Sequence, residues 1–96
     1  MTLEELRRTR RDQILSVAAS YGAHNIRVFG SAARGDSCPS SDIDFLVDLE
    51  PDRTLMDLGG LLIALQELLQ VRVDLATERM LRPKVRERAL ADAVPL

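Results

Sequence analysis

Two acidic residues, Asp42 and Asp44, stand one position apart in a stretch that is otherwise mostly apolar. In an extended strand, side chains at i and i+2 leave the same face, with Cα atoms about 7 Å apart. Two carboxylates brought to about 4 Å repel each other by roughly 1 kcal/mol in water and about 4 kcal/mol at an effective dielectric near 20. A divalent cation reverses the sign of this interaction, and Mg²⁺ prefers hard oxygen ligands. The pair therefore indicates a metal site, although a solvated strand face has the same spacing.

A third aspartate, Asp74, occupies the polar side of a later alternating stretch, residues 71–76. Beside Asp42 and Asp44 it would add to the repulsion, and so to the need for a cation. Two Mg²⁺ ions about 3.5 to 4 Å apart can hold both the attacking and the leaving oxygen of a phosphoryl transfer. The expected chemistry is therefore metal-dependent phosphoryl transfer.

A Gly-Ser turn, Gly30-Ser31, ends a short apolar run and precedes Asp42 by ten intervening residues. A glycine there lets the backbone approach a ligand closely, and the turn of helix that Ser31 begins has free N–H groups that attract phosphate. Arg34, one turn further on, adds a fork of donors suited to phosphate oxygens. Gly-Ser turns are common in loops, so the specific signal is their combination with the three aspartates.

The hydrophobic pattern predicts the elements that must position these residues. Apolar spacing and caps predict helices, and alternation predicts strands. We expect helices over about 3–20, 54–69 and 78–91, and strands over 26–29, 42–49 and 71–76. Pro83 should lie in the first turn of the last helix or mark the true start of that helix. Three short strands can bury a face only under helices, which predicts a two-layer α/β (α+β) domain with a small mixed sheet. The other face is expected to stay open and to carry the aspartates.

Composition and charge narrow the class of protein. At 96 residues, one domain over residues 1–96 is expected. The net charge of −2 gives no broad field for nucleic acid, so no direct nucleic-acid binding is expected. No apolar run has the length of a membrane span or the form of a signal peptide, which favours a cytoplasmic protein. Residues 36–57 hold seven acids and one base, whereas 78–92 hold five bases and three acids, a pattern that suits a cation together with an anionic ligand.

The segments GSAARGDSCPSSDIDFLV (30–47) and VRVDLAT (71–77) resemble the DNA polymerase β nucleotidyltransferase superfamily. Within it, the chain is similar to the minimal nucleotidyltransferases (MNT) that are paired with HEPN toxins in bacteria and archaea. The resemblance extends through LRPKVRERALADAVPL (81–96) and implies a nucleotidyltransferase fold. It also implies roles for six residues: Gly30, Ser31 and Arg34 bind the nucleotide triphosphate, Asp42 and Asp44 bind two Mg²⁺ ions, and Asp74 completes this metal site and takes the proton of the incoming hydroxyl.

The nature of the acceptor is inferred from the resemblance. Relatives that modify antibiotics or nucleic-acid ends carry extra domains for the acceptor, whereas about twenty residues follow Asp74 here. We therefore expect a partner to bring the acceptor: the resemblance implies an antitoxin that transfers AMP from ATP to a tyrosine of a HEPN ribonuclease toxin. Two alternatives stay open. The protein could neutralise the toxin by binding alone, through Leu3, Leu6 and the leucine-rich helix, or it could be a stand-alone transferase for a small molecule.

Overall fold

Short strands and helices alternate along the chain in the computed structural model, which describes residues 1–36 and 42–96. The order is α1 (Leu3–Glu5), η1 (Leu6–Arg10), α2 (Arg11–Ser20), β1 (Ala23–Phe29), α3 (Gly30–Arg34), β2 (Ile43–Leu49), α4 (Leu55–Leu69), β3 (Val73–Ala76), η2 (Glu78–Met80), α5 (Pro83–Asp92) and β4 (Val94–Pro95). The three predicted strands are present. No helix in this part of the chain is long and apolar enough to cross a membrane.

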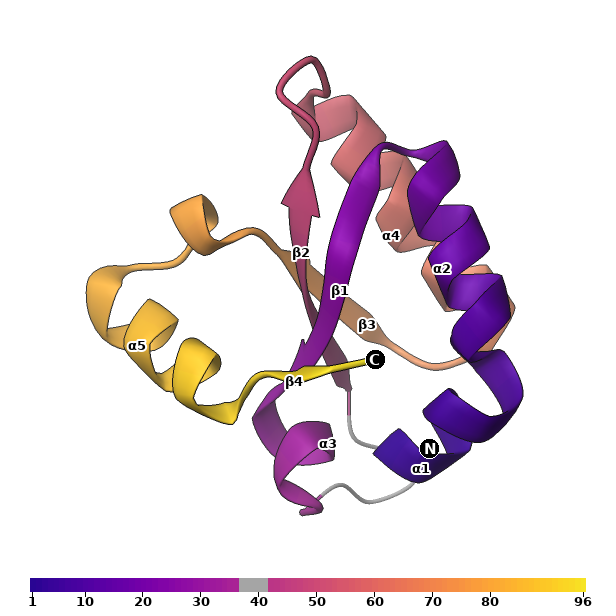
Figure 1. The fold of residues 1–96 in the computed structure, drawn as a ribbon, viewed down its shortest axis with the longest axis vertical. Helices are drawn as coiled ribbons and strands as arrows, with labels where there is room; N and C mark the ends of the chain where they lie inside the picture. Colours follow the sequence, from indigo (N-terminus) through magenta and orange to yellow (C-terminus); the bar gives the residue numbers. More distant parts are fainter. Residues whose placement is uncertain (37–41) are drawn as a thin grey trace.

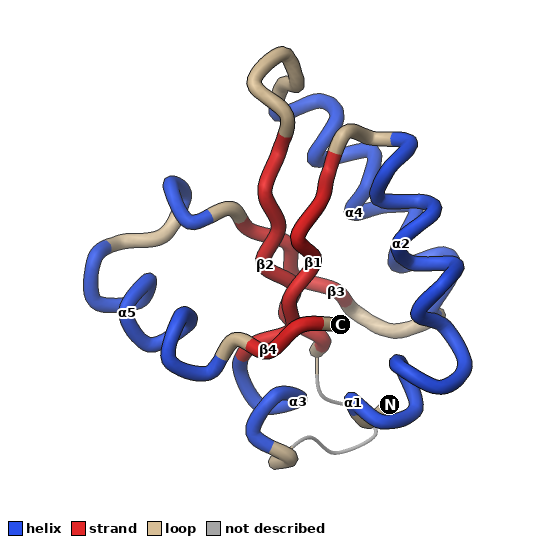
Figure 2. The backbone as a smooth tube through the Cα atoms, in the orientation of Figure 1, coloured by secondary structure: helices blue, strands red, loops and turns tan. Residues whose placement is uncertain are grey.

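The described strands form one mixed sheet in the order β3-β2-β1-β4 (Figures 1 and 2). Strand β2 pairs with β1 in the antiparallel sense and with β3 in the parallel sense, and β4 adds an antiparallel pair at the far edge of β1. The small mixed sheet is thus confirmed. The fourth strand was not predicted, because two residues that include a proline carry no alternation.

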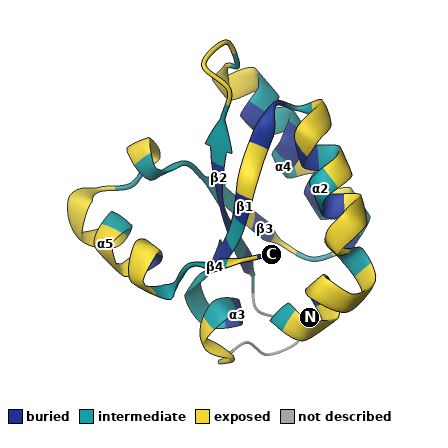
Figure 3. Ribbon diagram, in the orientation of Figure 1, coloured by how far each residue is buried: buried dark blue, intermediate teal, exposed yellow. Residues whose placement is uncertain are grey.

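The hydrophobic core lies between one face of the sheet and helices α2 and α4, which run side by side over it (Figures 1 and 3). The leucine stripe of α4 is part of this core, as its helical spacing predicts. The fully buried side chains at its centre come from each of these elements: Ile14 from α2, Val28 from β1, Phe45 from β2, and Leu61 and Leu65 from α4. Burial of this one face gives the two-layer architecture.

The opposite face of the sheet is more covered than the alternation predicts. Leu46 lies between Asp44 and Asp48 on the polar side of β2, yet its side chain is fully buried. Helix α5 packs on β1 and the η2 turn packs on β2 on that side of the sheet (Figure 1). The open region that remains contains the aspartates and is bounded by α5 and α3.

One predicted helix differs from the expectation in its interior and another at its start, each for an identifiable reason. The helix expected over 3–20 contains the π-helical segment η1. Leu6 and Ile14 are eight residues apart, so in a regular helix their side chains would point about 80° away from each other around the helix axis. The extra residue of a π turn brings the two side chains back to the same face. Both side chains are fully buried. The last helix begins at Pro83, with the 3-10 turn η2 before it, which agrees with a proline that marks the true start.

Candidate active site

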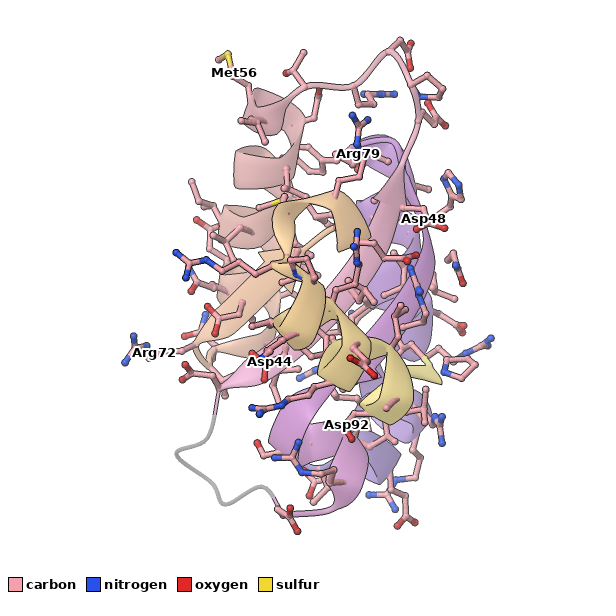
Figure 4. The ribbon with its side chains drawn as sticks, turned by 90° about the vertical axis from the view of Figure 1, so that its left-hand side faces the viewer. Asp44, Asp48, Met56, Arg72, Arg79 and Asp92 are labelled. Carbon is pink, nitrogen blue, oxygen red and sulfur yellow. The ribbon has the colours of Figure 1, made fainter. Side chains whose placement is uncertain are left out.

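Strand pairing brings Asp44 and Asp74 together, although thirty residues of sequence separate them. In the parallel β2–β3 ladder their Cα atoms are direct partners, and neighbours in register point the same way, so both carboxylates leave one face of the sheet. Asp74 is exposed, whereas Asp44 is half-buried. Figure 4 shows Asp44 on β2 beside α5. The two carboxylates therefore form the base of a site that faces solvent on its β3 side.

The Gly-Ser turn lies against the same carboxylate. In the antiparallel β1–β2 ladder Phe29 is the partner of Asp44, so Gly30 follows directly beside it. Gly30 has a φ of +72°, a conformation that favours glycine, and a Cβ at this position would collide with Oδ2 of Asp44. A residue with a side chain cannot occupy this turn unless the Asp44 carboxylate moves.

The surroundings of Asp44 favour its protonated form. Its pKa is raised from 3.8 to about 6, first by burial, then by a hydrogen bond with Asp74 and by the negative charges of Asp74 and Asp42; the Arg34 guanidinium opposes the rise. Burial and like charges both disfavour a carboxylate anion. A cation bound here would relieve the repulsion among these groups.

Asp42 lies just before β2, and its carboxylate is held less firmly than that of Asp44. Its Oδ1 is 3.8 Å from Nε of Arg72, a side chain that is 86% exposed, and Figure 4 shows Arg72 projecting away into solvent. Such an exposed pair contributes little to stability. Asp42 is therefore held loosely, and its carboxylate is accessible for a ligand.

Helix α3 places the remaining predicted residues at the opposite wall of the site. Ser31 is half-buried in its first turn, and Arg34 ends it. The guanidinium of Arg34 donates from Nε to Asp36 at 3.1 Å and from Nη1 to Asp92 at 2.6 Å. These hydrogen bonds raise the pKa of Arg34. All six predicted site residues thus belong to one region, whereas the spacer 37–41 lies outside the described residues.

The donor set fits a magnesium site that is completed by substrate. Magnesium is commonly bound by one or two carboxylates together with substrate phosphates and water, without a cage made only of protein. Among residues 1–36 and 42–96, no group of three or more His, Cys, Asp or Glu already forms such a cage. The adjacent carboxylates of Asp44 and Asp74, with Asp42 near them, supply the hard oxygens that an open site requires.

The raised pKa of Asp44 predicts a pH-dependent stability in the absence of metal. The folded state binds this proton more tightly than the unfolded state, so the free energy of unfolding falls as pH rises from 3.8 to about 6. Because Asp44 is only half-buried, solvent screening limits the loss to the order of 1 kcal/mol. We expect Asp44→Asn to raise the melting temperature at pH 7 in EDTA and to have little effect near pH 4.

Thermal unfolding of both proteins across this pH range measures the effect. Added Mg²⁺ at pH 7 should stabilise the natural protein and leave Asp44→Asn unchanged. If the difference in melting temperature between the two proteins were the same at every pH, the assignment of this titration to Asp44 would be contradicted.

Sequence reasoning missed two acidic neighbours of the site. Asp36 is not among the six predicted site residues, but it accepts a hydrogen bond from Arg34. Asp92 was not singled out at all, and its contact with Arg34 spans 58 residues. No motif links the end of α5 to α3, so only the tertiary structure reveals this pair. Asp48, which is also outside the predicted site, forms an ion pair with Arg27 at 3.0 Å.

The two adjacent acidic strands beside a glycine turn have the arrangement that the resemblance to nucleotidyltransferases leads us to expect. A family model described as "Nucleotidyltransferase domain" matches residues 11–96, and the chain belongs to this family. It is a transferase of the minimal nucleotidyltransferase kind, which confirms the resemblance seen in the sequence. It is 33% identical over 94 residues to the protein adenylyltransferase MntA of Thermococcus cleftensis, covering 98% of this chain and 95% of that protein.

Solved structures agree with this assignment. A structure described as a minimal nucleotidyltransferase is 51% identical to the chain, with a TM-score of 0.86 that covers 100% of this chain and 97% of the other. A toxin–antitoxin complex with AMP-PNP contains a chain that is 20% identical, with a TM-score of 0.76 over 90% of this chain and 71% of that one. At this lower identity the second comparison supports the fold alone.

Proposed function

We propose that this protein is an antitoxin that transfers AMP from ATP to a tyrosine hydroxyl of a HEPN ribonuclease toxin and so neutralises it. The observation that carries the proposal is the register of β2 and β3, which puts Asp44 and Asp74 side by side next to Gly30. The relative named protein adenylyltransferase MntA supports it, and the fold is shared with chains of toxin–antitoxin complexes. We further propose that residues 1–96 form a single domain and act in the cytoplasm.

Each residue of the site has a role in this reaction. Asp42, Asp44 and Asp74 would hold two Mg²⁺ ions, which when bound supply positive charge against the triphosphate and the leaving pyrophosphate. Asp74 is exposed on the side that an acceptor can reach, and it takes the proton of the tyrosine hydroxyl. The tyrosine oxygen forms a bond to the α-phosphorus while the bond from that phosphorus to the bridging oxygen breaks, and pyrophosphate leaves. The protein contributes mainly positioning and charge neutralisation.

The wall formed by α3 would hold the triphosphate. Gly30 keeps the backbone close to the Asp44 carboxylate, so phosphate bound at this turn lies beside the carboxylates. Ser31 offers a hydroxyl and a backbone N–H, and Arg34 offers a planar cation suited to phosphate oxygens. The negative charges that crowd around Asp44 explain why a nucleotide must enter together with its metal.

Intact mass spectrometry of the toxin tests the proposal. The toxin is incubated with this protein, Mg²⁺ and, separately, each of the four ribonucleoside triphosphates. We expect a mass increase of one or more AMP units with ATP, located by peptide mapping at a tyrosine. EDTA should abolish the increase. Unmodified toxin under all four conditions would contradict an enzymatic antitoxin.

A second candidate is neutralisation by binding alone, and one observation favours it. Three large apolar side chains of α4 are exposed: Leu55 at 73%, Met56 at 87% and Ile63 at 58%. Figure 4 shows Met56 at the start of α4, far from Asp44. The surface expected from Leu3 and Leu6 is absent, because Leu6 is fully buried and Leu3 packs on the core. Toxin inhibition that survives EDTA and Asp42→Asn would favour this candidate.

A further inference from the structure

The end of the last helix is tied directly to the nucleotide side of the site. Asp92, the final residue of α5, accepts a hydrogen bond through Oδ2 from Nη1 of Arg34 at 2.6 Å. The Asp92 side chain is 26% exposed and that of Arg34 is 49% exposed. A charge-assisted bond of this length is strong for its type. Two elements far apart in sequence, α3 and α5, are thus joined at one guanidinium.

The backbone that follows fixes the position of Asp92. Strand β4 begins two residues later and pairs with β1. Leu96 is buried, donates its backbone N–H to the carbonyl of Ile26 at 3.0 Å, and accepts through its own oxygen from Nε of Arg11 at 3.0 Å. An anchored strand immediately after the helix leaves the Asp92 Cα little freedom. The carboxylate is therefore a fixed point against which Arg34 is held.

The carboxylates of Asp36 and Asp92 orient the guanidinium of Arg34 without using all of its N–H donors. An arginine has five N–H donors. Asp36 takes the one on Nε and Asp92 takes one on Nη1, and no described residue accepts from Nη2. With respect to the described residues, three donors therefore remain for an anion. A guanidinium already fixed in its plane loses less side-chain entropy when it binds phosphate.

We infer that Asp92 is a positioning residue for nucleotide binding, which holds Arg34 in the orientation that receives the triphosphate. This inference rests on the proposed function, since it requires ATP to bind beside α3. Helix α5 thereby has a part in the site that none of the sequence motifs indicates.

Binding of MgATP and of inorganic tripolyphosphate, measured by calorimetry, tests the inference. Asp92→Asn should weaken both affinities about fivefold, the scale of a partly exposed ion pair. Asp92→Glu should restore most of the affinity. Glu87→Gln, which removes the same charge from an exposed position of α5, should leave it unchanged. In an Arg34→Ala background, Asp92→Asn should have no further effect, and melting curves should show each variant folded.

The outcomes separate this inference from the proposed function. Unchanged or tighter binding by folded Asp92→Asn would overturn the role of Asp92 while leaving the proposed function in place. An equal loss in the Arg34→Ala background, or no rescue by Asp92→Glu, would show that the effect does not pass through Arg34, and would also overturn it. If the natural protein bound neither MgATP nor tripolyphosphate, the proposed function itself would fail, and the role of Asp92 with it.

Discussion

Asp44→Asn is expected to lower the rate of AMP transfer to the toxin by about 10³-fold, on the scale of losing one strong electrostatic contact in a preorganised site. Asp44 lies against two other site residues: it is the register partner of Asp74 and it borders Gly30, and its pKa is raised to about 6 by burial and neighbouring carboxylates. An amide keeps the shape of the side chain but removes the anionic oxygen that a metal requires.

The same substitution should not damage the fold. Asparagine removes a charge that burial and two neighbouring acids disfavour, so the variant should be at least as stable as the natural protein at pH 7. We therefore expect Asp44→Asn to lose transfer, measured by single-turnover mass spectrometry, while its stability, measured by thermal unfolding, is retained or increased. This combination distinguishes a direct role in the reaction from damage to the fold.

Asp48→Asn provides a matched control. It makes the same change on the same strand and the same face, four residues further along, where Asp48 pairs with Arg27. Its transfer rate should stay close to that of the natural protein. Transfer by Asp44→Asn at a comparable rate would exclude Asp44 from the reaction.

Gly30→Ala is expected to reduce the transfer rate by about 10²-fold, because a displacement of about 1 Å in a reacting group has an effect of this size. The new Cβ would collide with Oδ2 of Asp44, and the β1–β2 ladder, whose last pair is Phe29 and Asp44, fixes the backbone beside the contact. The carboxylate must therefore move out of its place. The positive φ of +72° adds a cost of about 1 to 2 kcal/mol to folding.

Gly35→Ala separates these two effects. Gly35 has a φ of +81°, and no atom of the described residues lies within 4 Å of the position that its Cβ would take. It should lose about the same 1 to 2 kcal/mol of stability from backbone strain while its transfer rate remains near that of the natural protein. Equal losses of transfer in the two variants would mean that strain in the backbone, and not contact with Asp44, explains the role of Gly30.

The local pattern of the sequence determined most of the elements. The Thr54 and Asp57 capping box is present at the start of α4, four leucines of that helix are buried in the core, and Pro83 marks the start of α5. These features depend on residues within a few positions of one another, where propensity and periodicity act directly. The short β4 and the π turn of η1 lacked such signals, because packing against distant residues produces them.

For the candidate site, too, some features follow from the local sequence and others only from the tertiary structure. The sequence alone determined which residues are the candidates for the chemistry, since Gly30, Ser31, Arg34, Asp42 and Asp44 belong to one motif and Asp74 to a recognisable strand. Only the tertiary structure decided how they meet: the β2–β3 register sets Asp74 beside Asp44, and the β4 pairing brings Asp92 to Arg34. Register and helix placement are set by hydrogen-bond ladders and core packing between segments far apart in the chain, and a local sequence pattern carries no information on either.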